Sequence, residues 1–225
     1  MIRRHRQRAS FGIVTGRRLD SALRIMRRAG IPQPDVLITS VGTEIHYAPN
    51  VTPDTAFRRH IDHLWTPRVV RHLFAEIPGI EMQGPTEQSR FKISYFIDPE
   101  IAPSVEEIHS LLRQHDQTAN VFLSFGQFLD IVPIRASKGL ALRWFAQHWG
   151  IPLEQILAAG GSGTDEDMMR GNTLAVVVAN RHEEELSQLT DIDSIYFATR
   201  PFAAGILEAV EHYDFYEDCR VPQSQ

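Results

Sequence analysis

Short apolar runs alternate with amphipathic stretches at both ends of this chain, and this alternation limits the fold more than any other feature. Four runs have the length and composition of strands buried on both faces of a sheet: Phe11–Val14, Val36–Ile38, Ile156–Ala159 and Leu174–Val178. Three stretches have helical spacing: Leu19–Ala29, Lys138–Trp149 and Glu166–Met169 onward. Strands that alternate with helices predict an α/β domain with a parallel sheet, although the pattern does not fix the strand order.

The middle of the chain differs from its two ends. From about Pro53, two stretches with helical spacing alternate with two strand-like runs: Pro67–Ile77 and Val105–His115 for the helices, Arg90–Ile97 and Val121–Phe125 for the strands. We therefore predict a core made of residues 1–52 and 134–225, with an α+β subdomain inserted at 53–133. A last amphipathic helix is expected over Phe202–His212.

The charge and cysteine content exclude several classes of protein. The net charge is −5 and the pI is about 6.0, so the chain as a whole offers no electrostatic case for binding nucleic acid or an anionic membrane. Cys219 is the only cysteine, which excludes an internal disulfide and a cysteine-rich zinc site. Because no apolar run reaches the roughly 18 residues of a membrane span, we expect a soluble, cytoplasmic protein.

The first eight residues, Met1-Ile-Arg-Arg-His-Arg-Gln-Arg8, are basic and contain no acidic residue. Such a segment fits a transit peptide or an anionic partner. Because it passes directly into the predicted strand at Phe11, we favour a second interpretation, in which the arginines lie on the solvated face of a helix that is cut short at its start.

Two segments have residues suited to binding an anion. Thr15-Gly16-Arg17 follows a buried strand, where a phosphate oxygen could accept hydrogen bonds from the Thr15 hydroxyl and from Arg17. The alternative is that Thr15 only caps the following helix. Lys138 begins a strongly amphipathic helix, beside backbone N–H groups that an anion could also use, although most lysines at such positions are simply solvated.

A glycine-rich loop, 159–167, joins an apolar strand to a helix and carries three acidic residues. Carboxylates at the end of such a strand can hold a magnesium ion together with a substrate phosphate. The alternative is structural, because Thr164 and Asp167 have the spacing of a capping box, and acidic residues in a first helical turn complement the helix dipole.

Taken in order, these segments resemble the sugar phosphatases of the haloacid-dehalogenase-like (HAD) superfamily, and specifically the sucrose-phosphatase-like module found alone or at the carboxyl end of sucrose-phosphate synthases. The resemblance covers nearly the whole chain. It is carried by Thr15-Gly-Arg17, Leu37-Ile-Thr-Ser-Val-Gly-Thr-Glu-Ile-His46, Phe91-Lys-Ile-Ser94, Ala136-Ser-Lys-Gly139, Gly160-Gly-Ser-Gly-Thr-Asp165 and Gly171-Asn-Thr. The stretch from Tyr196 to Glu208 is more similar to the synthase-fused version.

The resemblance implies a HAD-like Rossmannoid core with an inserted α+β cap that selects the sugar. In that family an aspartate on the first strand attacks phosphorus, and a second aspartate two residues later acts as acid and base. No Asp-x-Asp pair precedes Thr15 in this chain. We therefore expect the first strand, the nucleophile and the acid/base residue to be missing.

The resemblance also assigns roles to individual residues. Thr15, Gly16, Arg17 and Lys138 correspond to the phosphate-binding positions. In the loop that holds Mg²⁺, the first aspartate of the family corresponds to Gly161, which leaves Asp165 and implies that magnesium binding is weak or lost. The cap residues that correspond to sugar-facing positions are Gln88, Lys92 and Asp130.

These observations support three hypotheses. We favour a degenerate module that binds a sugar phosphate such as sucrose-6-phosphate, or docks on the glucosyltransferase domain of a sucrose-phosphate synthase, without hydrolysing phosphate. The second is an active Mg²⁺-dependent phosphatase whose true start lies upstream of Met1. The third is a structural fragment of a synthase. Because the missing strand normally lies in the middle of the sheet, we also expect unpaired strand edges and a poorly stable or self-associating chain.

Overall fold

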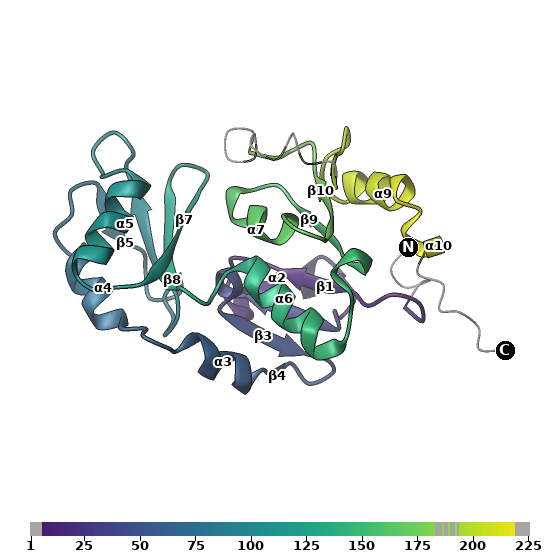
Figure 1. Cartoon of the computed structure of the whole chain (residues 1–225), viewed down its shortest axis with the longest axis horizontal. Helices are drawn as coiled ribbons and strands as arrows, with labels where there is room; N and C mark the ends of the chain where they lie inside the picture. The colour runs from purple at the N-terminus through teal and green to yellow at the C-terminus, as the bar shows by residue number, and fades with distance from the viewer. Residues whose placement is uncertain (1–5, 183–185, 187–188, 190–191, 193, 219–225) are drawn as a thin grey trace.

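The computed structural model describes residues 6–182, 186, 189, 192 and 194–218, and shows two lobes joined by a common apolar core (Figure 1). The first half of the core lobe contains β1 (Gly12–Val14), α2 (Leu19–Arg28), β2 (Val36–Thr39), η1 (Ser40–Gly42), β3 (Glu44–Tyr47), β4 (Thr52–Pro53) and α3 (Thr55–Ile61). Its second half contains α6 (Lys138–Trp149), η2 (Leu153–Gln155), β9 (Leu157–Gly160), η3 (Gly163–Asp165), α7 (Glu166–Met169), β10 (Leu174–Val177), β11 (Ile195–Phe197), α9 (Phe202–His212) and α10 (Phe215–Asp218).

The strands of the core lobe form two sheets, not one. The first has the order β1-β2-β3-β4, with β1 parallel to β2 and the other pairs antiparallel. The second, β11-β10-β9, is entirely parallel. The sequence pattern correctly predicts four of these strands to within one residue at each end, but the pairing is non-local and is not contained in that pattern.

Both β1 and β9 are therefore edge strands within the described residues, and no strand hydrogen bonds join them. Each is only partly buried: Gly12 is exposed, and Ile13, Leu157 and Ala159 keep partial exposure. A strand at the edge of a sheet leaves one row of backbone N–H and C=O groups without a ladder partner. The expectation of unpaired strand edges in the core is thus confirmed.

The second lobe contains α4 (Pro67–Phe74), β5 (Ile80–Met82), β6 (Ile93–Ile97), α5 (Val105–Gln114), β7 (Ala119–Ser124) and β8 (Phe128–Pro133). Its antiparallel sheet has the order β5-β6-β8-β7. Phe74 of α4 stacks on Tyr95 of β6, with ring centroids 5.2 Å apart, and the α5 residues Ile108 and Leu112 are buried. The lobe is a complete α+β unit, as expected for the cap, although β5 and β8 were not among the predicted strands.

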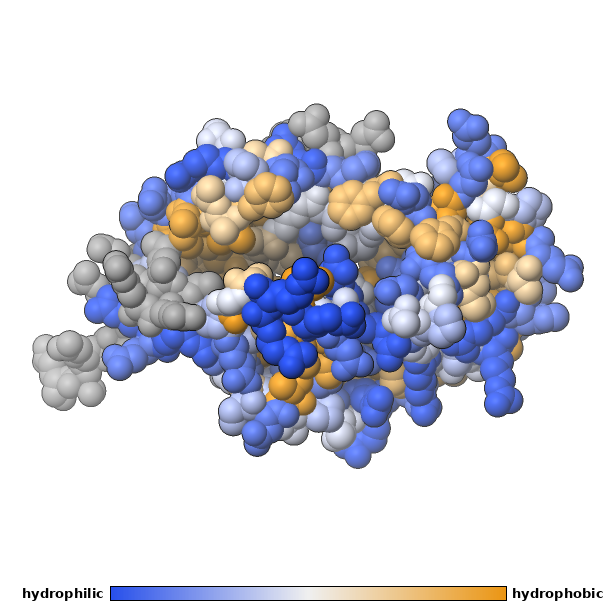
Figure 2. All heavy atoms as spheres, turned by 180° about the vertical axis from the view of Figure 1, so that it is seen from behind, coloured by the Kyte–Doolittle hydropathy of each residue, from blue (hydrophilic) through white to orange (hydrophobic). Residues whose placement is uncertain are grey.

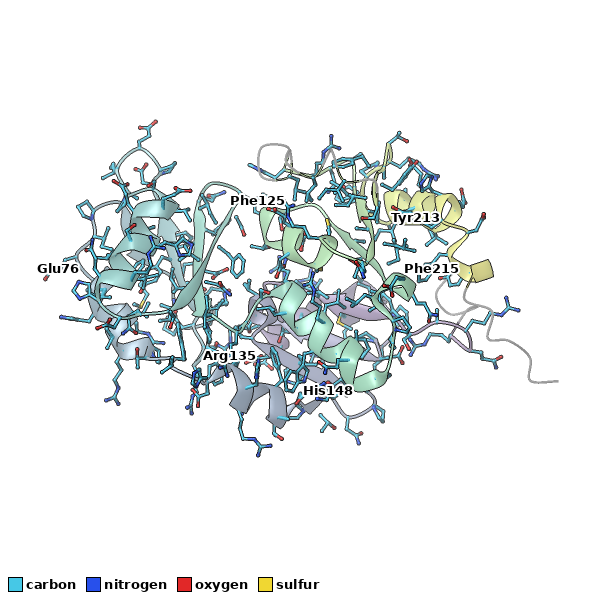
Figure 3. The ribbon with its side chains drawn as sticks, in the orientation of Figure 1. Glu76, Phe125, Arg135, His148, Tyr213 and Phe215 are labelled. Atoms are coloured by element: carbon cyan, nitrogen blue, oxygen red, sulfur yellow. The ribbon has the colours of Figure 1, made fainter. Side chains whose placement is uncertain are left out.

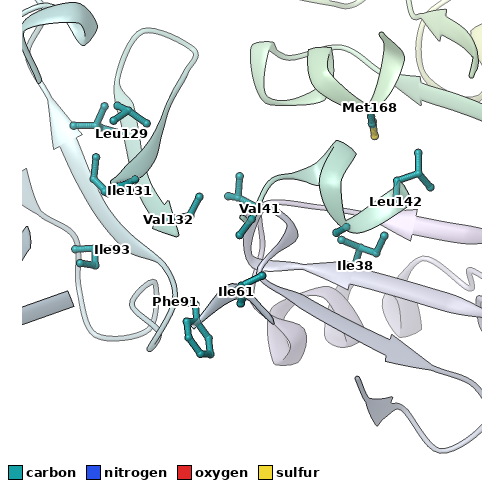
Figure 4. Packing of buried hydrophobic residues seen from close by; sticks show 14 of the residues in the cluster. Ile38, Val41, Ile61, Phe91, Ile93, Leu129, Ile131, Val132, Leu142 and Met168 are labelled. Atoms are coloured by element: carbon teal, nitrogen blue, oxygen red, sulfur yellow. The ribbon is translucent and has the colours of Figure 1, made fainter. Parts of the chain in front are cut away.

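The apolar core is continuous between the lobes (Figure 4). Ile61 and Val132 have no more than 1% of their surface exposed, and they belong to the same cluster as Ile38, Leu142 and Met168 of the core lobe. α3, which lies in the range expected for the cap, packs on α6, because the rings of Phe57 and Trp144 are 5.5 Å apart. The two lobes therefore share packing and do not meet only at a hinge.

The basic N-terminal segment corrects one prediction. Residues 1–5 of the predicted basic helix lie outside the described residues, but residues 6–8 form a turn and not a helix. Both terminal guanidinium nitrogens of Arg6 donate to the carboxylate of Asp35, at 2.5 and 2.7 Å. The second oxygen of Asp35 also accepts the backbone N–H of Phe11 at 2.7 Å. The aspartate before β2 thus fixes the chain that enters β1, which local sequence patterns do not indicate.

Candidate functional site

Loops from three parts of the core lobe meet at the start of α6. The backbone N–H of Val41, in the turn after β2, donates to the carbonyl of Thr15 at 3.2 Å. Gly42 lies so close to α6 that a Cβ there would be 2.6 Å from the backbone nitrogen of Lys138, and its φ of +83° also favours glycine. Lys138 in turn reaches Asp165 after β9. The carboxyl ends of β1, β2 and β9 therefore share one edge of the lobe.

The loop after β1 leaves its polar groups available. The Thr15 hydroxyl accepts the backbone N–H of Arg17 at 3.2 Å, and its own hydrogen remains free to donate. Arg18, not Thr15, occupies the N-cap of α2 and makes no side-chain cap hydrogen bond, so the capping interpretation of Thr15 is wrong. The exposed Arg17 guanidinium makes no hydrogen bond or ion pair with the described part of the chain. Gly16 lies between these two polar groups.

Lys138 is buried and already holds two partners. Only 5% of the residue is exposed, and its Nζ donates to Thr164 Oγ1 at 2.8 Å and to Asp165 Oδ1 at 2.6 Å. A lysine ammonium has three donors, so one remains for an anion. The backbone groups beside it are less available than expected, because the Gly139 N–H bonds Asp167 and the Leu140 N–H bonds the Ser137 cap.

Asp165 has a partner on each oxygen. Its Oδ1 accepts Lys138, and its Oδ2 accepts the backbone N–H groups of Gly161 and Ser162 and the Ser162 hydroxyl, each at 3.0 Å. Burial raises the pKa of the carboxyl, but Lys138 and the two backbone amides outweigh burial and leave the pKa lowered. Asp165 is therefore an ionised anchor for the glycine-rich loop, and the capping box is Ser162 with Asp165, not Thr164 with Asp167.

The described residues do not fit a magnesium site. Magnesium binds oxygen ligands and usually needs at least one or two carboxylates in addition to water and phosphate. Gly161 supplies no ligand, and both oxygens of Asp165 are occupied by protein donors. Within the described part of the chain, no group of three or more His, Cys, Asp or Glu residues is arranged to hold a metal ion.

Asp167 differs from its neighbour Asp165 in its hydrogen bonding and in the direction in which its pKa is shifted. Its Oδ2 accepts the Gly139 N–H at 2.9 Å, whereas its buried Oδ1 has no hydrogen-bond partner. Burial raises the pKa of Asp167. Hydrogen bonds from Ser137 and Gly139 and the charges of Arg143 and Lys138 lower it, but burial outweighs them and the pKa stays raised. A carboxyl with one unpaired, desolvated oxygen favours its protonated form.

The three predicted sugar-facing residues of the cap lie together around Ser94. Lys92 is only 3% exposed, and its Nζ donates to Ser94 Oγ at 2.7 Å and to Asp130 Oδ1 at 3.3 Å. Ser94 Oγ bonds the same Asp130 oxygen at 2.5 Å, and Gln88 bonds both the N–H and the carbonyl of Ser94. Sequence reasoning missed Ser94 as a member, although its alternation with Lys92 places both on one face of the sheet.

The lobes also touch outside the common core. Arg18 donates to the carbonyl of Thr86 at 3.2 Å. Phe125 lies at the tip of the β7–β8 hairpin (Figure 3), and its ring meets that of His182 edge-on, with centroids 5.8 Å apart. A cleft of about 520 Å³ lies between β7 and α7, lined by residues such as Phe122 and Asp167. Its walls include neither the Thr15 loop nor the cap cluster, so this cleft is not the predicted binding site.

Comparisons with known proteins agree with this geometry. The model of the family "Sucrose-6F-phosphate phosphohydrolase" matches residues 1–214. The mannosylfructose-phosphate phosphatase of Agrobacterium fabrum is 30% identical over 200 residues, which are 88% of this chain and 81% of that protein. The crystal structure of the sucrose-phosphatase from Synechocystis sp. PCC6803 in complex with sucrose and phosphate is 28% identical, covers 95% of this chain and 88% of its own, and superposes with a TM-score of 0.89.

The chain covers less of its plant relatives. Sucrose-phosphatase 1 of Nicotiana tabacum is 30% identical over 190 residues, which are 80% of this chain but 45% of that protein. More distantly, a HAD subclass IIB sugar phosphatase shares the fold, with a TM-score of 0.63 at 17% identity. In the part of the chain that the structure describes, no helix is long and apolar enough to cross a membrane.

Proposed function

Because this chain belongs to the sucrose-6F-phosphate phosphohydrolase family and has the HAD fold, we propose that it binds a sugar phosphate between its two lobes. The observation that carries the proposal is the buried Lys92–Ser94–Asp130 cluster of the cap. A lysine, a hydroxyl and a carboxylate held together in this way form a pre-organised site for neighbouring sugar hydroxyls.

The proposed roles follow from the unused bonding capacity of each group. Lys92 has one N–H left, and Asp130 Oδ2 makes no hydrogen bond with the described residues, so a sugar hydroxyl can accept from the first and donate to the second. The phosphate would accept hydrogen bonds from the Thr15 hydroxyl, the Arg17 guanidinium and the third N–H of Lys138. Gln88 holds the Ser94 backbone and so positions the cluster.

We further propose that the described residues bind the sugar phosphate without hydrolysing it. The carboxylate at the phosphate end, Asp165, accepts four hydrogen bonds, one of them from Lys138, so both of its oxygens are already held by protein donors. No residue of the Thr15 loop is a nucleophile activated by a neighbouring base. The family's magnesium is therefore not part of the proposal.

A specific observation favours a second candidate, a magnesium-dependent sugar-phosphate phosphatase. The sheet edges of β1 and β9 are both unpaired in the described residues and belong to parallel strands whose ends share one loop cluster. One further parallel strand between them would pair both edges and end beside Thr15 and Asp165, where it could add the missing carboxylates.

One experiment separates the two candidates. Calorimetric binding of sucrose-6-phosphate, sucrose and inorganic phosphate is measured together with phosphate release, with and without Mg²⁺. We expect sucrose-6-phosphate to bind more tightly than either part, without phosphate release. Lys92→Met should weaken the binding of sucrose-6-phosphate by about tenfold or more and leave the binding of phosphate unchanged, because one hydrogen bond from a charged donor contributes about 1.5–3 kcal/mol.

Arg68, an exposed arginine of α4, supplies the matched control, and Arg68→Gln should bind as the unaltered chain does. Magnesium-dependent release that Asp165→Ala abolishes would replace the first candidate with the second. If Lys92→Met and Arg68→Gln bind sucrose-6-phosphate equally, the cap cluster is not the sugar site.

A further inference from the structure

Arg18 joins the phosphate end of the core lobe to the cap. It directly follows the Thr15-Gly16-Arg17 loop and occupies the N-cap of α2. Its Nη1 donates to the carbonyl of Thr86 at 3.2 Å and lies 3.5 Å from the carbonyl of Pro85. Both carbonyls belong to the cap, so this one side chain ties the loop proposed for the phosphate to the other lobe.

The other arginines around α2 do not make such contacts. Four of them are exposed, and their side chains form no hydrogen bond or ion pair with the described part of the chain: Arg17, Arg24, Arg27 and Arg28. Figure 2 shows the back of the molecule, where strongly hydrophilic side chains gather near the middle, at the place that α2 has in Figure 1. Arg18 is only partly exposed. Contact with the cap is therefore a property of Arg18 and not of this basic helix in general.

The cap loop that Arg18 bonds is a tight turn with one carbonyl left over. The Pro85 carbonyl accepts a backbone N–H of the same turn, and the Glu87 carbonyl accepts the hydroxyl of Ser94 at 3.3 Å. Between them, the Thr86 carbonyl has Arg18 as its only hydrogen-bond partner among the described residues. The turn thus completes its hydrogen bonding with a residue of the core lobe.

The same turn leads directly to the cap cluster. Gln88, at its end, accepts the N–H of Ser94 at 3.0 Å and donates to the Ser94 carbonyl at 2.7 Å. Ser94 Oγ in turn bonds Asp130 and Lys92, at 2.5 and 2.7 Å. A continuous path of backbone and hydrogen bonds therefore runs from the Thr15 loop through Arg18 and the turn to the cluster proposed for the sugar.

From this path we infer that Arg18 is a positioning residue that fixes the separation between the phosphate end and the sugar end of the site. The inference rests on the proposed function. When two subsites are held at a fixed separation, the second end of a ligand binds at a high effective concentration, and this gain falls when the separation varies. Arg18 would thus make the site favour a ligand that carries a phosphate and a sugar at the matching distance, without itself contacting either group.

The test compares Arg18→Gln with Arg24→Gln, its matched control on the same helix, in the full chain. The probes are sucrose-6-phosphate, sucrose and inorganic phosphate, measured by calorimetry and ligand-observed NMR. We expect Arg18→Gln to weaken sucrose-6-phosphate binding about tenfold and to change the binding of each separate part by less than about twofold. Arg24→Gln should change none of them by more than about twofold. Both variants should melt cooperatively by circular dichroism, because the lobes share a buried apolar core.

A double-mutant cycle with Lys92→Met adds a measurement that a purely structural role would not affect. Once the sugar end is weakened, Arg18→Gln should reduce sucrose-6-phosphate affinity by less than about threefold, instead of tenfold. Equal affinities of the two arginine variants, an equal loss for inorganic phosphate, or additive losses in the cycle would each overturn the inference and leave the proposed function standing. If the unaltered chain binds sucrose-6-phosphate no more tightly than inorganic phosphate, the proposed function fails, and this inference fails with it.

Discussion

The two lobes each contain one buried lysine–aspartate pair, and the two pairs differ in what they leave open. The exposed fractions of the side chains are nearly the same, 4% and 14% for Lys92 and Asp130, against 6% and 12% for Lys138 and Asp165. In the cap, one oxygen of Asp130 receives both Lys92 and Ser94, and the other oxygen makes no bond with the described residues. In the core, both oxygens of Asp165 are occupied.

The two lysine–aspartate pairs therefore differ in how much hydrogen-bonding capacity they keep after they have stabilised the fold. These two lysines are the only ones in the sequence, where arginine supplies every other cationic side chain apart from histidine. A compact ammonium can be enclosed by two or three oxygens, whereas a guanidinium needs more room. The core pair fixes the glycine-rich loop to α6, whereas the cap pair is built similarly but leaves one oxygen of Asp130 without a partner among the described residues.

The largest expected effect comes from removing each lysine. Lys138→Met leaves Asp165 buried and ionised without its counter-charge, so we expect the free energy of unfolding to fall by about 3–5 kcal/mol. Lys92→Met should cost less, about 1–2 kcal/mol, because the free oxygen of Asp130 can still be solvated. Urea denaturation monitored by circular dichroism measures both. Equal losses would show that the two pairs play the same structural role.

A smaller effect is expected in the chemical reactivity of the two lysines. Acylation by an activated ester requires a free amine, and both ammonium groups are enclosed, so both should react slowly in the folded chain. Sucrose-6-phosphate should slow the acylation of Lys92 by a further factor of about five or more, because it would occupy the remaining N–H. Mass spectrometry of the digested protein measures each site, and unchanged Lys92 reactivity at saturating ligand would contradict the sugar site.

Neighbouring carboxyls of the core loop should respond to pH in opposite directions. The pKa of Asp165 is lowered on folding. Its contribution to the free energy of unfolding is therefore present above its unfolded pKa near 4 and is lost as pH falls through the folded pKa. The pKa of Asp167 is raised on folding. Its contribution to the free energy of unfolding is therefore present in acid and is lost as pH rises through the folded pKa.

Unfolding free energies of Asp165→Asn and Asp167→Asn, measured between pH 3 and 7 against the unaltered chain, check these signs. The stability deficit of Asp165→Asn should shrink on acidification, whereas that of Asp167→Asn should shrink as pH rises. Parallel pH profiles for the two variants would contradict the difference between the carboxyls.

Local patterns in the sequence predict the elements better than their assembly. The helix from Lys138 to Trp149 is predicted to the residue because Ser137 caps its start and Gly150, at φ +65°, ends it. β8 was missed because the turn that separates it from β7 places Phe125 in a left-handed conformation, which an aromatic residue does not signal. The division of the core into two sheets depends on pairing between distant strands and cannot be seen in any one segment.

The candidate functional site was likewise predicted better in its individual residues than in their contacts. The resemblance to sugar phosphatases identified Gln88, Lys92 and Asp130 as a group, and the structure brings them together. The same resemblance left Asp165 as a possible metal ligand, because a sequence shows a carboxylate but not the backbone N–H groups directed at it. In both lobes the sequence did not predict which hydroxyl and backbone groups bond the charged side chains, because the geometry of the loops places those groups.

The smallest expected effect tests the metal argument at Gly161. A Cβ there would meet Val178 Cγ2 at 3.1 Å and otherwise only ordinary contacts, so Gly161→Asp should be tolerated after a shift of a few tenths of an ångström. The new carboxylate would lie beside Asp165, which stays bound to Lys138, so Mg²⁺ should raise the melting temperature only slightly, by about 1–2 °C at millimolar concentration. Gly161→Asn adds the same volume without the charge and should show no Mg²⁺ effect. A large stabilisation of the unaltered chain by Mg²⁺ would mean that Asp165 can exchange Lys138 for a metal, and the core pair would then be as open to ligands as the cap pair.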